Sequence, residues 1–180
     1  PRINYDDHAA YPIYARAQAL GMPILFHTGI GGRFPRDAEF DVDNERHRPV
    51  RLDRIARAFP ELKIIGAHLG LPWVWEASFV ALFNSNVWFD LAGIDRSEKL
   101  MPGLLNFREL LWAGGRHHGK IVFGTEGAPE NIGWVKKEYE DLLERLNVAP
   151  ATRQLIMGGT VAQMLGLGSQ AAAASGAVAK

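Results

Sequence analysis

Four short apolar runs alternate along the chain with longer segments of amphipathic helical periodicity. The runs cover about residues 23–27, 63–67, 87–91 and 120–123. Runs of this length, apolar at nearly every position, are typical of strands buried on both faces of a parallel sheet. Their starts recur every 24 to 40 residues, which leaves room for one helix between successive strands. The pattern therefore predicts an α/β domain of parallel strands with surrounding helices.

Amphipathic segments fill the spaces between these runs. Asp7 is placed to cap a helix that ends near Leu20, and Pro12 marks the start of its regular part. Residues 28–49 show no periodicity, and a connection of that length often carries function. The patterns predict one domain over residues 1–168 and a flexible alanine-rich tail at 169–180. Further helices are predicted at about residues 50–59, 73–83, 106–113, 134–146, 151–157 and 161–165.

A doubly wound sheet is the main rival to a barrel built from these strands. It favours a glycine-rich phosphate loop that directly follows a strand and opens a helix. The one candidate, Gly29-Ile30-Gly31-Gly32, leads into the polar stretch instead. The sequence therefore favours part of a barrel.

Composition narrows the classes of function. Twenty basic and twenty acidic side chains cancel, which argues against a nucleic-acid partner. No apolar run is long enough to span a membrane. The absence of cysteine excludes disulfides and thiol nucleophiles and is compatible with the cytoplasmic location that we expect.

Three side chains of metal-binding type stand at the ends of predicted strands. His27 and His68 close the first and second runs, and Glu126 follows the last, although about 40 and 58 residues separate them in sequence. Parallel strands deliver their carboxyl ends to one edge, so these side chains should converge. Imidazole and carboxylate bind zinc and related metals, and a neutral imidazole also serves as a base. Taken singly, each histidine is better explained by a backbone hydrogen bond and Glu126 by a helix start, but their shared position favours a site.

Other polar residues carry weaker signals. Arg33 is placed to bind a substrate carboxylate, although it is also explained as a solvated loop arginine. Trp73 is placed to line a pocket, although it is equally explained by packing at a helix start. Asp90 ends the third run, where it either orients a neighbour or accepts backbone hydrogen bonds. His47 lies among charged residues and is expected to be solvated.

Five segments, taken in order, resemble one enzyme family. The chain looks like part of the amidohydrolase-related family, metal-dependent TIM-barrel enzymes that include aminocarboxymuconate-semialdehyde decarboxylase. The resemblance covers about residues 10–167. Its segments are Phe26-His27-Thr28-Gly29, Phe59-Pro60-Glu61-Leu62-Lys63-Ile64-Ile65, Ala67-His68-Leu69-Gly70-Leu71-Pro72-Trp73, Asn86-Val87-Trp88-Phe89-Asp90-Leu91 and Phe123-Gly124-Thr125-Glu126.

The resemblance implies a role for each of the three strand-end residues. His27 would end barrel strand five and bind a divalent metal, expected to be Zn²⁺. His68 would end strand six as the catalytic base or a further ligand, and Glu126 would end strand eight as the acidic ligand. That last position is usually aspartate, and its glutamate resembles the hydratase branch, such as oxalomesaconate hydratase. Hydrolysis, decarboxylation and hydration, with a metal-activated water and a histidine base, all remain open.

The family's first barrel strand carries a His-x-His pair, and no such pair occurs in this chain. The resemblance therefore implies the C-terminal half, about strands five to eight, of a (β/α)₈ TIM barrel. One hypothesis is a metal-dependent hydrolase or carbon–carbon lyase (decarboxylase) for a small carboxylated or aromatic-derived substrate. The other is a non-catalytic or truncated fragment that packs with a partner or a second copy. Either way, one edge of the sheet, at residues 23–27 or 120–123, should be open.

Overall fold

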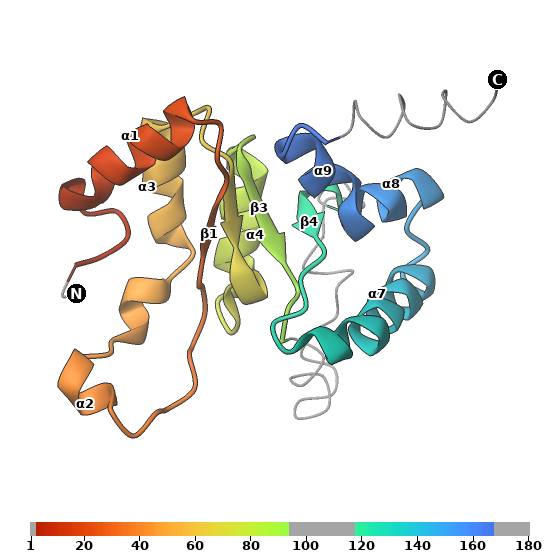
Figure 1. Cartoon of the computed structure of the whole chain (residues 1–180), viewed down its shortest axis with the longest axis horizontal. Coiled ribbons are helices and arrows are strands. Elements are labelled where there is room, and N and C mark those ends of the chain that lie inside the picture. Colours follow the sequence, from red (N-terminus) through yellow and green to blue (C-terminus); the bar gives the residue numbers. More distant parts are fainter. Residues whose placement is uncertain (1–2, 94–117, 168–180) are drawn as a thin grey trace.

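A parallel sheet of four strands runs through the chain, whose computed structural model describes residues 3–93 and 118–167 (Figure 1). The strand order is β1-β2-β3-β4, and every neighbouring pair is parallel. Each strand lies inside a run that the sequence predicts, so the α/β class with a parallel sheet is confirmed. The strands are β1 (Ile24–Phe26), β2 (Ile64–Gly66), β3 (Val87–Asp90) and β4 (Ile121–Val122).

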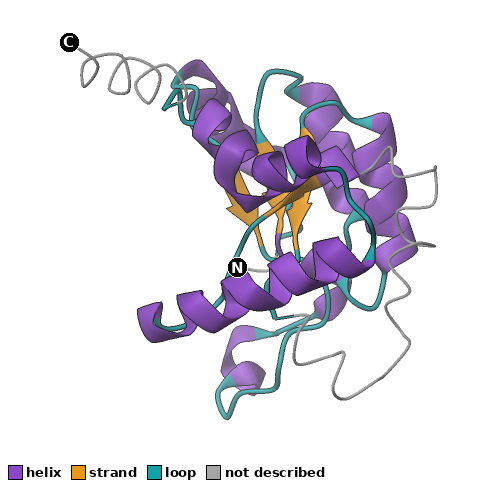
Figure 2. Cartoon of the chain, turned by 90° about the vertical axis from the view of Figure 1, so that its right-hand side faces the viewer, coloured by secondary structure: helices purple, strands orange, loops and turns teal. Residues whose placement is uncertain are grey.

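Helices flank the sheet along its length (Figures 1 and 2). The two helices α1 and α3 lie beside β1, whereas α7, α8 and α9 lie beside β4 (Figure 1). None of the helices among the described residues is long and apolar enough to cross a membrane. The bounds are α1 (Tyr11–Ala19), α2 (Asp37–Phe40), α3 (Val50–Ala58), α4 (Val74–Phe83), α7 (Ile132–Arg145), α8 (Pro150–Gln154) and α9 (Thr160–Met164).

The helices pack on the sheet through faces of regularly spaced apolar residues. In α3 the buried residues Leu52, Ile55 and Ala56 recur at helical spacing and face the strands. In α7 they are Val135, Tyr139 and Leu143, while two exposed lysine–carboxylate pairs lie on the outer face. The core between helices and sheet is centred on fully buried side chains that include Phe89, Leu52, Ile64 and Ile121.

Two segments differ from the expected pattern. Residues 28–49 are not structureless, because they hold α2 and a 3₁₀ turn at Asn44–His47, whose start Asp43 caps by accepting from the N–H of Glu45. The two expected C-terminal helices are joined by a π-helical segment at Leu155–Gly159, where Gly158 has φ of 149°. The helix predicted at 106–113 and the tail at 169–180 lie outside the described residues.

The two edge strands of the sheet, β1 and β4, differ in whether their outer edge is covered. The backbone N–H of Phe123, just after β4, donates to the carbonyl of Ile156 at 2.9 Å, so the π-helical segment covers that edge. On the other side, no described strand pairs with the outer edge of β1. Leu25 in the middle of β1 is 63% exposed. The open edge is therefore the one at β1.

Candidate active site

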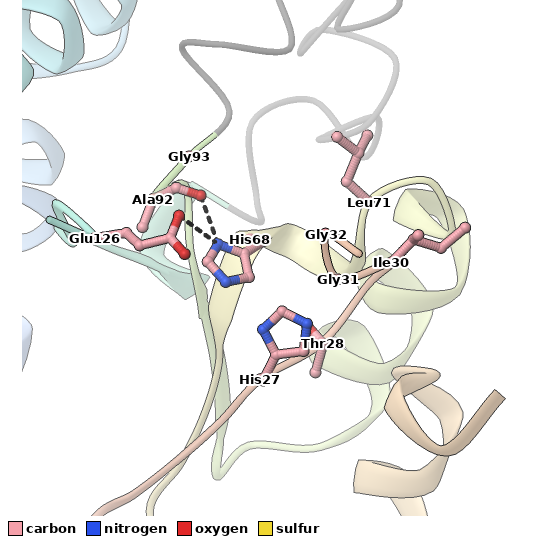
Figure 3. Close-up of a pocket in the computed structure, with 10 residues that line it drawn as sticks. All are labelled: His27, Thr28, Ile30, Gly31, Gly32, His68, Leu71, Ala92, Gly93 and Glu126. Atoms are coloured by element: carbon pink, nitrogen blue, oxygen red, sulfur yellow. Dashed lines mark hydrogen bonds and ion pairs between the residues drawn. The ribbon is translucent and has the colours of Figure 1, made fainter. Parts of the chain in front are cut away.

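The carboxyl ends of β1, β2 and β4 bring His27, His68 and Glu126 together (Figure 3). The ring centroids of His27 and His68 are 4.9 Å apart. Nδ1 of His68 lies 3.8 Å from Oε2 of Glu126. The convergence that the sequence predicts is thus present, with His68 in the middle.

The turn that carries His68 has an unusual backbone. His68 has φ of 63° and Leu69 has φ of 47°, which is the left-handed region that side chains with a Cβ rarely adopt. The N–H of His68 donates to Oδ1 of Asp90 at 2.9 Å. Nδ1 of His68 lies 2.7 Å from the carbonyl oxygen of Ala92. Both contacts come from the end of β3, which therefore fixes the histidine.

The loop after β1 is tied to the same turn. The buried hydroxyl of Thr28 donates to the carbonyl of Ala67, and the N–H of Ile30 donates to the carbonyl of Leu71 at 2.8 Å. Gly29 has φ of 97° and its backbone lies against Leu71, so a Cβ there would clash. These contacts tie the loop that carries His27 to the turn that carries His68.

His47 is a member of the site that the sequence does not reveal. It was expected to be solvated, but its ring meets that of His27 nearly at right angles, at 4.9 Å between centroids. Its other face stacks on Tyr5 at 5.9 Å. Burial lowers the pKa of His47, and its buried Nδ1 has no hydrogen-bond partner among the described residues. The carbonyl of His47 accepts the N–H of Gly29 at 3.0 Å, which holds the end of the 3₁₀ turn against the loop after β1.

Burial controls the other resolved pKa shifts at this edge. It lowers the pKa of His27, and the neighbouring imidazoles of His68 and His47 lower it further. It raises the pKa of Asp90, against the two backbone N–H groups that favour its charged form. A neutral His27 at pH 7 is the form that can accept a proton or bind a cation.

Two adjoining pockets open on either side of the histidine pair. One of about 200 Å³ is bordered by the glycine-rich loop after β1, and its lining is drawn in Figure 3. The other, of about 330 Å³, is bordered by Leu25, Asp90 and Thr125. His27, His68 and Glu126 line both. A small molecule in either space would contact all three.

Arg33 and Trp73 lie away from these pockets. Arg33 is exposed in the loop after β1 and lines neither space. Trp73 lies under the guanidinium of Arg48, which is 5.3 Å from its ring centroid and is paired to Glu76 at 2.6 Å. The structure therefore brings neither side chain to the histidines.

The donor set suits part of a metal site. His27, His68 and Glu126 offer nitrogen and oxygen donors, but Nδ1 of His68 already faces a carbonyl. Within residues 3–93 and 118–167, no group of three or more histidine, cysteine, aspartate or glutamate side chains is placed to hold a metal ion. A catalytic zinc site normally has three protein ligands and an open position.

The comparison that decides the family is a match to the amidohydrolase family model over residues 1–167. The chain belongs to the amidohydrolase family. The resemblance carried by the five segments is thereby confirmed. Among curated proteins, the amidohydrolase chain is similar to Protein fluG of Emericella nidulans, with 24% identity over 143 residues, 74% of this chain and 15% of that protein.

Solved structures share the fold at low sequence identity. An uncharacterized TIM-barrel protein from Bordetella bronchiseptica matches with a TM-score of 0.66 and 24% identity, over 92% of this chain and 53% of that one. A dihydroxybenzoic acid decarboxylase from Polaromonas sp. JS666, solved with bound manganese and the inhibitor 2-nitroresorcinol, matches with a TM-score of 0.57 and 21% identity, over 92% and 56%. The chain thus spans about half the length of these structures and less of its curated relative.

Proposed function

We propose that the chain supplies part of the active site of a metal-dependent hydrolase or carbon–carbon lyase. The observation that carries the proposal is the meeting of His27, His68 and Glu126 at the ends of three parallel strands. Active sites of TIM barrels lie at this face, built from residues that follow several strands. The substrate is a small carboxylated or aromatic-derived molecule, and the reaction is hydrolysis, decarboxylation or hydration.

The chain would form the C-terminal half of the barrel, about strands five to eight. The choice of the C-terminal half rests on the resemblance of the five segments, and two observations support half a barrel. The TIM-barrel structures that it resembles are nearly twice as long as the matched part. The sheet has four strands among the described residues and an unpaired outer edge at β1, whereas a closed barrel has eight. The rest of the longer protein would supply the missing strands and donors.

His27 and Glu126 would hold the divalent metal, with donors from the missing half. When bound, such an ion supplies positive charge that acidifies water or polarises a substrate oxygen. His68 would act as the base. Its Nδ1 faces a carbonyl oxygen, which only accepts hydrogen bonds, so Nδ1 carries the proton and Nε2 keeps its lone pair. In Figure 3 that second nitrogen lies on the side of the ring nearer His27.

The lining of the second pocket supports an aromatic-derived substrate. Leu25, Ala67 and Ala92 give it an apolar wall opposite Asp90 and Glu126. A ring packed on that wall would place a substituent beside Nε2 of His68. No arginine or lysine among the described residues lines either pocket, so a substrate carboxylate would be neutralised by the metal or by the missing half.

Metal retention tests the proposal. The protein is made as the longer chain that includes the upstream half, dialysed against metal-free buffer and analysed by mass spectrometry. His27→Ala and Glu126→Ala should each lose the bound metal, because each removes a donor. The matched control is His8→Ala, which should retain the metal, because His8 is an exposed histidine in the turn just before α1. Metal content unchanged in both site variants would overturn the assignment.

The open edge of β1 favours a second candidate, a fragment that packs with a partner or with another copy. Leu25 is 63% exposed on the face that the missing strands would cover. If this face mediates association, Leu25→Lys should reduce the average mass in light scattering. Ile13→Lys changes a side chain that is equally exposed, at 66%, on the outside of α1 and should have no effect. A monomeric parent chain would contradict this candidate.

A further inference from the structure

Asp90 connects the ends of two strands through a single carboxylate oxygen. The residue closes β3 and is 6% exposed. Its Oδ1 accepts the backbone N–H of His68 at 2.9 Å and the backbone N–H of Ala92 at 3.0 Å. A carboxylate is a stronger acceptor than an amide carbonyl, so both bonds are of the charge-assisted kind. The end of β2 and the end of β3 are thereby held at a fixed distance.

The bond to His68 restrains a strained backbone. Left-handed φ values at two successive residues with side chains cost about 1–2 kcal/mol each, and His68 and Leu69 are two such residues. The N–H of Leu71 also donates to the carbonyl of His68, at 3.1 Å. Without the carboxylate, the N–H of His68 would lose its one acceptor in the described residues, and the turn would have less to oppose its strain.

The second bond holds Ala92, the residue whose carbonyl faces the imidazole and sets its protonation. The carbonyl of Ala92 lies 2.7 Å from Nδ1 of His68. The partner of one ring nitrogen decides which nitrogen carries the proton in the neutral ring. Oδ1 of Asp90 therefore controls His68 from two directions, through its backbone N–H and, by way of Ala92, through its ring.

Gly124 shows that the surroundings are fitted to this carboxylate. A Cβ built on Gly124 would lie 2.9 Å from Cγ and Oδ2 of Asp90 and 3.0 Å from its Cβ. Real Cβ atoms essentially never come that close, and Asp90 is too buried to move aside. Gly124 must therefore remain glycine if Asp90 is to keep its position.

From these contacts we infer that Asp90 is the positioning residue for His68, and that it maintains the tautomer with the proton on Nδ1 and the lone pair on Nε2. The inference rests on the proposed role of His68 as a base. Asp90 acts on His68 through the turn and through Ala92, whose backbone N–H groups its Oδ1 accepts. Among the described residues, no other side chain bonds both to the His68 backbone and to the strand that faces its ring.

Nitrogen-15 spectra of the histidine rings, recorded without metal or substrate, test the inference directly. At pH 8 an ordinary imidazole is neutral, so the shifts of Nδ1 and Nε2 report the tautomer. Wild-type His68 should show the Nδ1–H form. In Asp90→Ala the Nδ1–H population should fall below the Nε2–H population, whereas Asp90→Asn, which keeps an acceptor oxygen, should resemble the wild type.

Two further variants keep the test decisive. Gly124→Ala should displace the carboxylate and shift the tautomer in the same direction, which decides the matter if Asp90→Ala does not fold. Asn86→Ala removes a buried amide with three backbone acceptors at the opposite end of β3 and should leave the tautomer unchanged. An unchanged tautomer in folded Asp90→Ala, or an equal shift in Asn86→Ala, would overturn the inference.

The same data separate this inference from the proposed function. The tautomer is read without turnover, so a shift in Asp90→Ala supports the positioning role even in a chain that proves catalytically inert. Conversely, a longer chain that loses metal in His27→Ala but keeps the His68 tautomer in Asp90→Ala would support the metal site and reject the role of Asp90.

Discussion

The two ends of the sheet satisfy their polar groups in opposite ways. At the amino end, Asn86 donates through one amide to the carbonyls of Ala56, Phe59 and Leu62. Beside it, the ammonium of Lys120 donates to three backbone carbonyls, in residues 84, 85 and 87. Loops are thus closed here by side chains whose donor groups all bind backbone carbonyls.

At the carboxyl end of the strands, by contrast, some backbones are strained and a buried polar atom is unsatisfied within the described residues. His68, Leu69 and Glu126 adopt positive φ, and Nδ1 of His47 is buried without a partner among the described residues. Strained backbones and unsatisfied polar atoms persist where the surrounding structure holds them for another purpose. In barrels, the amino end of the strands serves stability and the carboxyl end serves function. The contrast between the two ends therefore supports a functional site at the carboxyl end.

Asn86→Ala should give the largest loss of stability. It leaves three carbonyls without their shared donor, at a residue that is 9% exposed. Unsatisfied buried groups of this kind cost about 2–4 kcal/mol together. Urea unfolding followed by circular dichroism measures the change. The matched variant at the carboxyl end is Asn44→Ala, which loses one bond from Gly31 and should cost about 1 kcal/mol or less. Equal losses of stability in the two variants would contradict the difference that we describe between the two ends of the sheet.

Lys120→Met should cost less, about 1–2 kcal/mol, because the ammonium is only partly buried and water can reach some of the carbonyls it leaves. Methionine preserves the apolar stem over the ring of Trp88, from which Nζ now lies 4.7 Å. A gain in stability would show that burial of the charge outweighs its three hydrogen bonds.

The pH dependence of stability gives a second test of the buried Lys120 ammonium. Burial lowers the pKa of Lys120 to about 8, below its ordinary value of 10.5. Between these values the unfolded chain binds more protons than the folded one, so stability due to this group should rise as pH increases from about 8 towards 10.5. The free energy of unfolding of the wild type, relative to Lys120→Met, should therefore increase over that range. A flat difference would mean that the three carbonyl acceptors hold the pKa at its usual value.

Glu126→Gly should have the smallest effect, and of opposite sign. Glu126 has φ of 37° and its side chain is 59% exposed, so glycine would relieve the left-handed backbone at little loss of contact. We expect a gain of about 1 kcal/mol or less in thermal or urea unfolding. Glu130→Gly, in the 3₁₀ turn Pro129–Asn131, has no such strain to relieve and should destabilise. Destabilisation by both changes would show that Glu126 is not strained.

Periodicity and strand-end residues predict the fold and much of the site. The apolar runs predict all four strands, and parallel geometry then requires His27, His68 and Glu126 to meet. His47 could not be predicted, since its place depends on a 3₁₀ turn within a stretch that has no periodicity. For Arg33 and Trp73 the sequence leaves both a site role and a plainer role open. In the structure Arg33 is exposed and the Trp73 ring lies under Arg48, because the fold brings that arginine from another segment. For Asp90 the sequence predicts either an orienting role or backbone hydrogen bonds, and the structure shows the backbone bonds. The sequence does not reveal that one donor is His68, 22 positions earlier, because that contact depends on the pairing of two strands.

Paramagnetic broadening by Mn²⁺ tests the central claim, that the carboxyl edge carries one part of a metal site. The measurement is a titration of the 180-residue chain followed in amide and histidine-ring spectra. Because the donor set is incomplete, the ion should bind weakly and in fast exchange, and signals of His27, His68 and Gly93 should broaden first. Broadening that begins instead near Asp6 and His8, or tight stoichiometric binding that survives His27→Ala, would contradict the account.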